Sequence, residues 1–159
     1  MNTRFPFRLI RSTSLAAFSL LALVFLSGPS VAQTPPSPWT SSDVIQPEVL
    51  AKLLAGAHKP LIFQVGFEFL YKQGHIPGAQ HTGAGRDADG IENLKNAVSK
   101  VSRHRQIVLY CGCCPWDHCP NVRPAFLAMQ QWGFKDVRVL YLPHNFDIDW
   151  MQKGYPTEK

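Results

Sequence analysis

Three short, nearly continuous apolar runs, at residues 61–65, 106–110 and 137–142, dominate the hydrophobic pattern of the chain. A strand buried on both faces of a parallel sheet has such a run, whereas a half-exposed strand alternates apolar and polar residues. We therefore predict three inner strands of a mostly parallel sheet.

Between these runs, apolar residues recur three or four positions apart, which is the spacing of one face of a helix. The clearest series is formed by Ile91, Leu94, Val98 and Val101. The same spacing predicts further helices at residues 47–56 and 121–132, and residues 68–72 are a short helical candidate closed by Gly74. Strands that alternate with helices predict a single α/β domain, with a central sheet covered by helices on both faces.

The first 32 residues have the three parts of a secretory signal peptide. Three arginines lie within the first eleven residues, residues 12–26 carry no charge, and the small residues Ser30 and Ala32 precede the expected cleavage point. The uncharged stretch is shorter than the roughly 20 residues needed to cross a bilayer. We therefore expect a protein exported to the periplasm or beyond, with no membrane attachment once residues 1–32 are removed.

Composition after this segment is that of one folded domain. Residues 33–42 are rich in proline and serine and are expected to form a flexible linker, followed by a domain at residues 43–157. The whole chain is 45% hydrophobic, which is enough for a packed core. Beyond residue 32 the chain has 13 Lys and Arg against 11 Asp and Glu, which is too balanced for a nucleic-acid-binding surface.

All four cysteines lie within nine residues, at Cys111, Cys113, Cys114 and Cys119. Disulfides that stabilise a small exported fold join distant segments, which this cluster cannot do. Cys111 directly follows a predicted strand, and a predicted helix begins near Asn121. A helix N-terminus and a cation such as Arg123 would increase the thiolate fraction of a nearby cysteine, so the loop is a candidate nucleophilic site.

Four motifs, in order, give the chain a resemblance to a known family. They are Gly-His-Ile-Pro-Gly-Ala at residues 74–79, Ile-Val-Leu-Tyr-Cys at 107–111, Gly-Phe-Lys-Asp-Val at 133–137, and Trp-x-x-x-Gly-x-Pro at 150–156. Together they resemble the rhodanese-like domain family over most of the chain after residue 43. The resemblance implies a single rhodanese-like domain with sulfurtransferase activity.

For the site, the resemblance implies that Cys111 carries sulfane sulfur as a persulfide. The sulfur would come from a small donor such as thiosulfate and pass to a thiol or to cyanide, with no cofactor. Loop amides such as that of Gly112 would hold the negative charge of the outer sulfur, and Arg123 would bind an anionic donor.

The chain also departs from the family's usual site. Eleven residues separate Cys111 from Arg123, where the family usually has four between cysteine and arginine. Pro115 and Pro120 remove two amide donors from the loop. We therefore expect a conserved fold that carries a rebuilt loop.

The rebuilt loop leaves three alternatives open. Cys111 and Cys114 form a C-x-x-C pair that suits thiol–disulfide exchange, with Cys113 and Cys119 as further resolving or redox candidates. Zinc or a soft copper ion could instead bind a ligand set. That candidate set is Cys111, Cys114, His118 and Cys119. A non-catalytic rhodanese-like docking module is the third alternative.

Other residues near these motifs have simpler interpretations. His118 is a candidate acid–base group or ligand, but it is equally consistent with an exposed loop residue. Trp116 is expected to pack beneath the loop. Asp147 and Asp149 are expected at the surface.

Overall fold

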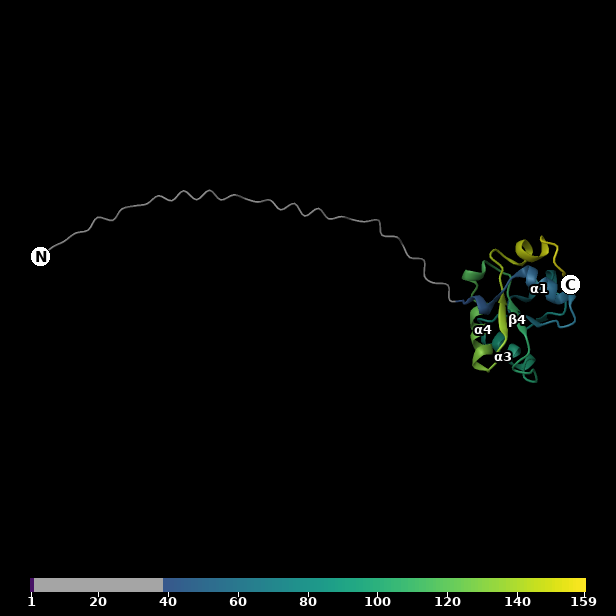
Figure 1. Cartoon of the computed structure of the whole chain (residues 1–159), viewed down its shortest axis with the longest axis horizontal. Coiled ribbons are helices and arrows are strands. Elements are labelled where there is room, and N and C mark those ends of the chain that lie inside the picture. The colour runs from purple at the N-terminus through teal and green to yellow at the C-terminus, as the bar shows by residue number, and fades with distance from the viewer. Residues whose placement is uncertain (2–38) are drawn as a thin grey trace. The chain divides into compact units, whose positions relative to one another are not determined.

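Five strands form one parallel sheet in the computed structural model, which describes Met1 and residues 39–159 (Figure 1). The strand order is β1-β5-β4-β2-β3, so β4 lies at the centre, between β2 and β5. The strands are β1 (Val44–Ile45), β2 (Leu61–Gln64), β3 (Gln80–His81), β4 (Ile107–Tyr110) and β5 (Val137–Leu140). The three predicted inner strands are confirmed, and the two-residue edge strands β1 and β3 are additional.

The described residues contain four α-helices, and each overlaps a helix expected from the sequence. They are α1 (Pro47–Ala55), α2 (Glu68–Gln73), α3 (Ala88–Ala97) and α4 (Val122–Gln131). The third ends at Ala97, so Val98 and Val101 of its expected apolar series lie beyond the helix. Gly133, two residues after α4, has φ of +86°, a left-handed conformation that suits glycine and closes the helix. Short helical turns at Ser41–Asp43, Trp116–His118 and Asp147–Met151 were not predicted.

The core has one layer on each face of the sheet. Ile107, Leu109 and Cys111 pack with residues of α3 and α4, whereas Val108 and Tyr110 pack with α1 and with Trp150. Successive residues of a strand point to opposite faces, so the alternation along β4 directs Cys111 towards α4. Figure 1 shows α1 on one side of β4 and α3 with α4 on the other, which confirms the expected α/β architecture.

The packed domain begins before residue 43. The ring of Trp39 stacks on Trp116 with 5.4 Å between ring centroids and meets Phe126 edge-on at 5.2 Å. The last part of the expected linker is thus packed against the domain, while residues 33–38 and the expected signal peptide lie outside the described residues. Within the described part of the chain, no helix combines the length and the apolar character of a membrane span.

Candidate functional site

A tight turn brings the chain from β4 into the cysteine loop. Gly112 has φ of +80°, and a Cβ at this position would lie 2.6 Å from the Cβ of Phe146. The backbone N–H of Phe146 donates to the carbonyl oxygen of Gly112 at 3.2 Å. The turn therefore requires glycine for its conformation and for the close approach of Phe146.

Three cysteine sulfurs from both sides of this turn lie close together. The Sγ atoms of Cys111, Cys113 and Cys119 all lie within 4.8 Å of one another, and we call these three residues the sulfur triad. Cys111 and Cys113 are 3.2 Å apart at Sγ, and all four cysteines are free thiols. Cys114 lies beside the triad, with its Sγ 3.1 Å from that of Cys113. The triad thus contains Cys113 where the C-x-x-C interpretation placed Cys114.

Asn121, directly before α4, connects the triad to the rest of the fold. Its side chain is fully buried, and its Nδ2 donates to the Sγ of Cys111 at 3.3 Å and, more weakly, to that of Cys113 at 4.0 Å. Its Oδ1 accepts the backbone N–H of Arg86 at 3.4 Å. Sequence reasoning used Asn121 only as a helix start and missed its contact with sulfur.

Within the triad, the pKa of Cys119 is lowered. Hydrogen bonds from the thiols of Cys111 and Cys113, together with the backbone N–H groups of Asn121 and Val122, lower the pKa of Cys119 despite its partial burial. These N–H groups belong to the start of α4, where unpaired amides favour an anion. The amides that sequence analysis expected to act on Cys111 therefore act on Cys119.

The pKa of Cys111 is raised in the same network. Its hydrogen bond with Cys113 lowers its pKa, but the bond to Cys119, burial and the charge of Cys119 outweigh this and raise the pKa of Cys111 to about 12. The pKa of Cys113 is also raised, first by its bond with Cys111 and then by its bond with Cys119. With only 3% of Cys111 exposed, that sulfur is enclosed by the α4 side of the core.

Residues at the end of β2 and directly after it pack against Cys111. The buried side chain of Gln64 donates from Nε2 to the carbonyl oxygen of Cys111 at 3.2 Å, and its Oε1 accepts from Nδ1 of His81 at 2.6 Å. At Gly66, a Cβ would lie 2.7 Å from the Sγ of Cys111. Glycine at this position therefore leaves room for the cysteine sulfur.

A cavity of about 250 Å³ opens beside Cys113. Its lining residues are Leu70, Gln73, Gly74, Gly112, Cys113, Asn145, Phe146, Asp147 and Met151. A second cavity, of about 10 Å³, reaches Cys111, which is room for about one water molecule. Among the triad residues, Cys113 is thus the one that lines a cavity large enough for a small substrate.

Asp149 fixes the loop that forms one wall of this cavity. Its carboxylate accepts the backbone N–H groups of His144 at 2.6 Å and Asn145 at 2.9 Å, and Nδ1 of His144 lies 2.9 Å away. The expectation that Asp149 lies at the surface is wrong, because the turn over Asp147–Met151 directs it inward. Asp147, from the same turn, is exposed as expected.

A family model of the rhodanese-like domain matches residues 46–141. This chain belongs to the rhodanese-like domain family. The expected resemblance and the expected fold are therefore confirmed. The motif at residues 74–79 and Cys111 lie within the matched segment, whereas the closing motif at 150–156 lies beyond it.

Solved structures share this fold at low sequence identity. The crystal structure of the Alr3790 protein from Anabaena sp. is 24% identical, with a TM-score of 0.55, over 72% of this chain and 81% of that one. The solution structure of the rhodanese-like domain of Alr3790 is 25% identical, with a TM-score of 0.51, over 73% and 78% of the two chains. Wild-type EanB is 23% identical, with a TM-score of 0.51, over 72% of this chain and 27% of its own. No curated protein matches the chain.

Two residues expected in the site of this rhodanese-like domain lie at its exterior. The guanidinium carbon of the exposed Arg123 lies 5.9 Å from the ring centroid of Trp39. His118 is 79% exposed, with Nδ1 2.8 Å from a carboxylate oxygen of Asp117, and is not part of the triad. Trp116 packs as expected, between Trp39 and an edge-on contact with Tyr141. The anion-binding role of Arg123 stays a prediction.

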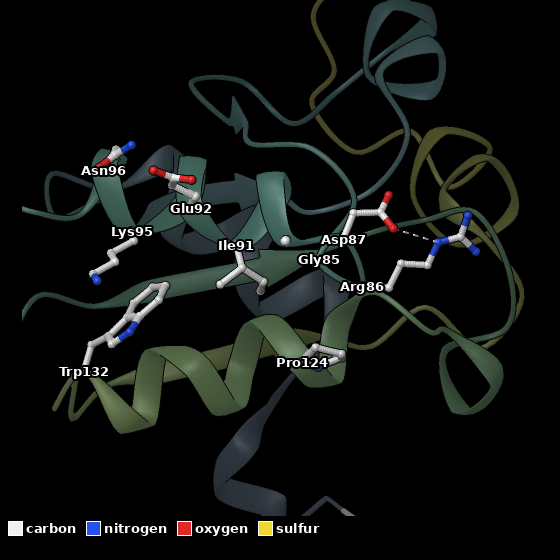
Figure 2. Close-up of a pocket in the computed structure, with 10 residues that line it drawn as sticks. Gly85, Arg86, Asp87, Ile91, Glu92, Lys95, Asn96, Pro124 and Trp132 are labelled. Carbon is white, nitrogen blue, oxygen red and sulfur yellow. Dashed lines mark ion pairs between the residues drawn. The ribbon is translucent and has the colours of Figure 1, made fainter.

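A larger cavity, of about 680 Å³, lies away from the cysteines, between α3 and α4 (Figure 2). Arg86 and Asp87 form an ion pair of 3.6 Å at one end, while Glu92, Lys95 and Trp132 lie at the other. No cysteine lines it within the described residues. Of this cavity and the cavity beside Cys113, the latter is the one that a cysteine lines.

Proposed function

We propose that this rhodanese-like domain carries sulfane sulfur as a cysteine persulfide within the sulfur triad. Family membership supports sulfurtransferase-type chemistry at this level. The observation that carries the proposal is the position of Cys113, which lines the cavity of about 250 Å³ and contacts both other triad members. A small donor, such as thiosulfate, has room to reach that sulfur.

The transfer needs no external oxidant. The sulfur of Cys113 attacks the outer sulfur of the donor, the donor's S–S bond breaks, and the remainder leaves with the electron pair, as sulfite does from thiosulfate. The thiol proton of Cys113 leaves with the departing group, as hydrogen sulfite when the donor is thiosulfate. A thiolate or cyanide acceptor then attacks the outer sulfur, and Cys113 leaves with its electrons.

Two groups beside Cys113 support a persulfide in this proposal. The amide of Asn121 reaches the sulfurs of Cys111 and Cys113 from a buried position, so it is preorganised to donate to an anionic sulfur. The thiol of Cys111 lies 3.2 Å from the sulfur of Cys113. In this proposal Cys111, expected from sequence as the carrier, is the neighbouring donor because its own cavity is too small for a donor molecule.

Intact-mass measurement after reduction and treatment with thiosulfate tests the proposal. We expect the protein to gain the mass of one sulfur atom, the Cys113→Ser variant to gain none, and the matched Cys114→Ser variant to gain one. If Cys113→Ser still gains one sulfur atom and Cys111→Ser gains none, our assignment is overturned in favour of Cys111. Absence of sulfur gain with thiosulfate and with an organic persulfide would overturn the carrier function and favour a docking module.

A dithiol relay is the second candidate function, and the separation of 3.2 Å between the sulfurs of Cys111 and Cys113 favours it. The pair would lose two protons and two electrons to a disulfide substrate, which is reduced to two thiols. In glutathione buffers of graded potential, we expect Cys114→Ser to keep a reversible two-hydrogen mass change that Cys113→Ser lacks. Persistence of that change in Cys113→Ser would exclude this pair.

We also propose that the domain acts outside the cytoplasm, as the signal-like residues 1–32 predict. Cell fractionation followed by intact-mass analysis tests this. A mature chain that begins after residue 32 in the periplasmic or external fraction is expected. A full-length chain retained in the cytoplasm would contradict the proposal.

A further inference from the structure

We propose that the sulfur triad also binds a single Cu(I) ion, a metal-binding activity distinct from sulfane-sulfur transport. The Sγ atoms of Cys111, Cys113 and Cys119 come from two ends of the loop and all lie within 4.8 Å of one another. A metal ion bonded to three sulfurs in a plane at about 2.3 Å holds those sulfurs about 4 Å apart. The triad is therefore close to the required size, and small side-chain movements complete the site.

The ligand types favour Cu(I) over other metal ions. Thiolates are soft ligands that select Cu(I), zinc or iron–sulfur clusters, whereas magnesium and calcium require oxygen. Zinc in a structural site takes four ligands. Among the described residues the triad contains three sulfurs and neither imidazole nor carboxylate, since His118 is directed to Asp117 and Asp149 accepts backbone N–H groups. The Sγ of Cys114 lies 3.1 Å from that of Cys113 but is outside the set of sulfurs that all lie within 4.8 Å of one another. The triad therefore offers three soft sulfurs, which suits Cu(I).

The groups around the triad fit a bound, anionic metal–thiolate centre. Asn121 donates to Cys111 and Cys113, and the backbone N–H groups of Asn121 and Val122 donate to Cys119. Such N–H···S bonds orient the ligands and reduce the excess negative charge that three thiolates give a monovalent ion. Every member of the triad thus has a donor from the segment that begins α4.

The site gives a metal ion a route to the triad and also shields the sulfur of Cys111 from solvent. Cys111 is almost fully buried against the core, which limits contact of the sulfur with water and oxidants. Cys113 lines the cavity of about 250 Å³, which gives an ion a route to the triad. Binding releases thiol protons and leaves copper in the same oxidation state, so no electron acceptor is needed.

Anaerobic competition for Cu(I) against a colorimetric chelator tests the proposal on the reduced chain, with stoichiometry from native mass spectrometry. We expect one ion per chain, and X-ray absorption is expected to show three Cu–S bonds and no Cu–N bond. The Cys113→Ser and Cys119→Ser variants should each bind at least about 100-fold more weakly, and Asn121→Ala about 10–100-fold more weakly. Cys114→Ser is the matched control and should stay within about threefold of the parent chain.

The outcomes separate this proposal from sulfur carriage. Unchanged affinity for Cu(I) in Cys119→Ser would overturn the three-sulfur site. An equal loss of Cu(I) affinity in Cys114→Ser and Cys113→Ser would do the same. Preferential binding of zinc with four sulfurs would overturn the choice of metal. Sulfur loading is measured with a metal chelator present, so a chain that gains sulfur but does not bind copper refutes this inference alone. Circular dichroism of each variant confirms that weaker binding is not caused by unfolding.

Discussion

The amide Nδ2 of Asn121 donates to the Sγ of Cys111 at 3.3 Å, and Oδ1 of the same side chain accepts the N–H of Arg86 at 3.4 Å. One buried side chain therefore joins the end of β4, the start of α4 and the segment that precedes α3. Loss of this amide leaves the part-buried backbone N–H of Arg86 and the buried thiol of Cys111 without this partner, which carries a desolvation cost.

For Asn121→Ala, we expect the free energy of unfolding to fall by about 1–3 kcal/mol, measured by urea denaturation. Asn96→Ala is the matched control, because Asn96 is exposed on α3 and alanine favours helix. The control should change the free energy of unfolding by no more than about 0.5 kcal/mol. Equal stability of the two variants would show that the Asn121 amide does not hold the loop.

Alkylation of Cys119 should persist at low pH. Because the thiols of Cys111 and Cys113 and the amides of α4 lower the pKa of Cys119, its thiolate remains populated below the range of an ordinary thiol. An ordinary cysteine, with a pKa near 8.5, loses about tenfold in thiolate for each unit of pH below that value. Between pH 7 and pH 5, we expect Cys119 in chelator-treated protein to lose less than about tenfold in its rate with iodoacetamide.

Peptide mapping after timed labelling makes that measurement, and Cys114 is the internal control. Burial and its neighbours raise the pKa of Cys114, so its labelling should become negligible at pH 5. Preferential labelling of Cys111 or Cys113 at pH 5 would contradict the lowered pKa of Cys119.

Replacement of Gly66 by alanine should disturb the packing of Cys111 and Gln64. The new Cβ would lie 2.7 Å from the Sγ of Cys111 and 2.8 Å from Nε2 of Gln64, so the sulfur or the amide must move. We expect a loss of about 1–3 kcal/mol in the free energy of unfolding. Gly56→Ala is the control, since a Cβ there meets its nearest atom at 3.4 Å. Comparable losses in the two variants would argue against close packing at Gly66.

Trp39 should contribute to stability although it lies in a proline- and serine-rich segment. Its ring packs on Trp116 and Phe126, so Trp39→Ala is expected to lower the free energy of unfolding by about 1–3 kcal/mol. Phe69→Ala is a matched control, because that aromatic ring is 59% exposed. Urea denaturation of both variants makes the comparison, and a stable Trp39→Ala variant would place the domain boundary after this residue.

The inner strands and the helices could be predicted because buried elements have recognisable apolar patterns in the sequence. β2, β4 and β5 are apolar on both faces, and α4 shows an apolar stripe, so their patterns identify them without a structure. The edge strands β1 and β3 have two residues each, which is too short for any periodicity. Trp39 was missed because composition alone does not show which aromatic residue of a linker-like segment finds a packing partner.

For the site, the sequence predicted where Cys111 lies in the fold but not which residues contact it. Cys111 was expected at the end of a central strand, where the structure has it. Whether Cys113 or Cys114 lies against Cys111 depends on the left-handed turn at Gly112, which spacing does not encode. Asn121 and Asp149 act through side-chain direction, and an isolated polar residue next to a helix gives no signal of that direction in the sequence.

Trp116 lies between Cys114 and Cys119 in the chain and stacks on Trp39, so the loop contains its own fluorophore. Indole emission responds to neighbouring sulfur and to solvent. A single-tryptophan variant that keeps Trp116 would therefore convert each change at the neighbouring cysteines into an optical signal, and rapid-mixing measurements could follow it in real time without any added label.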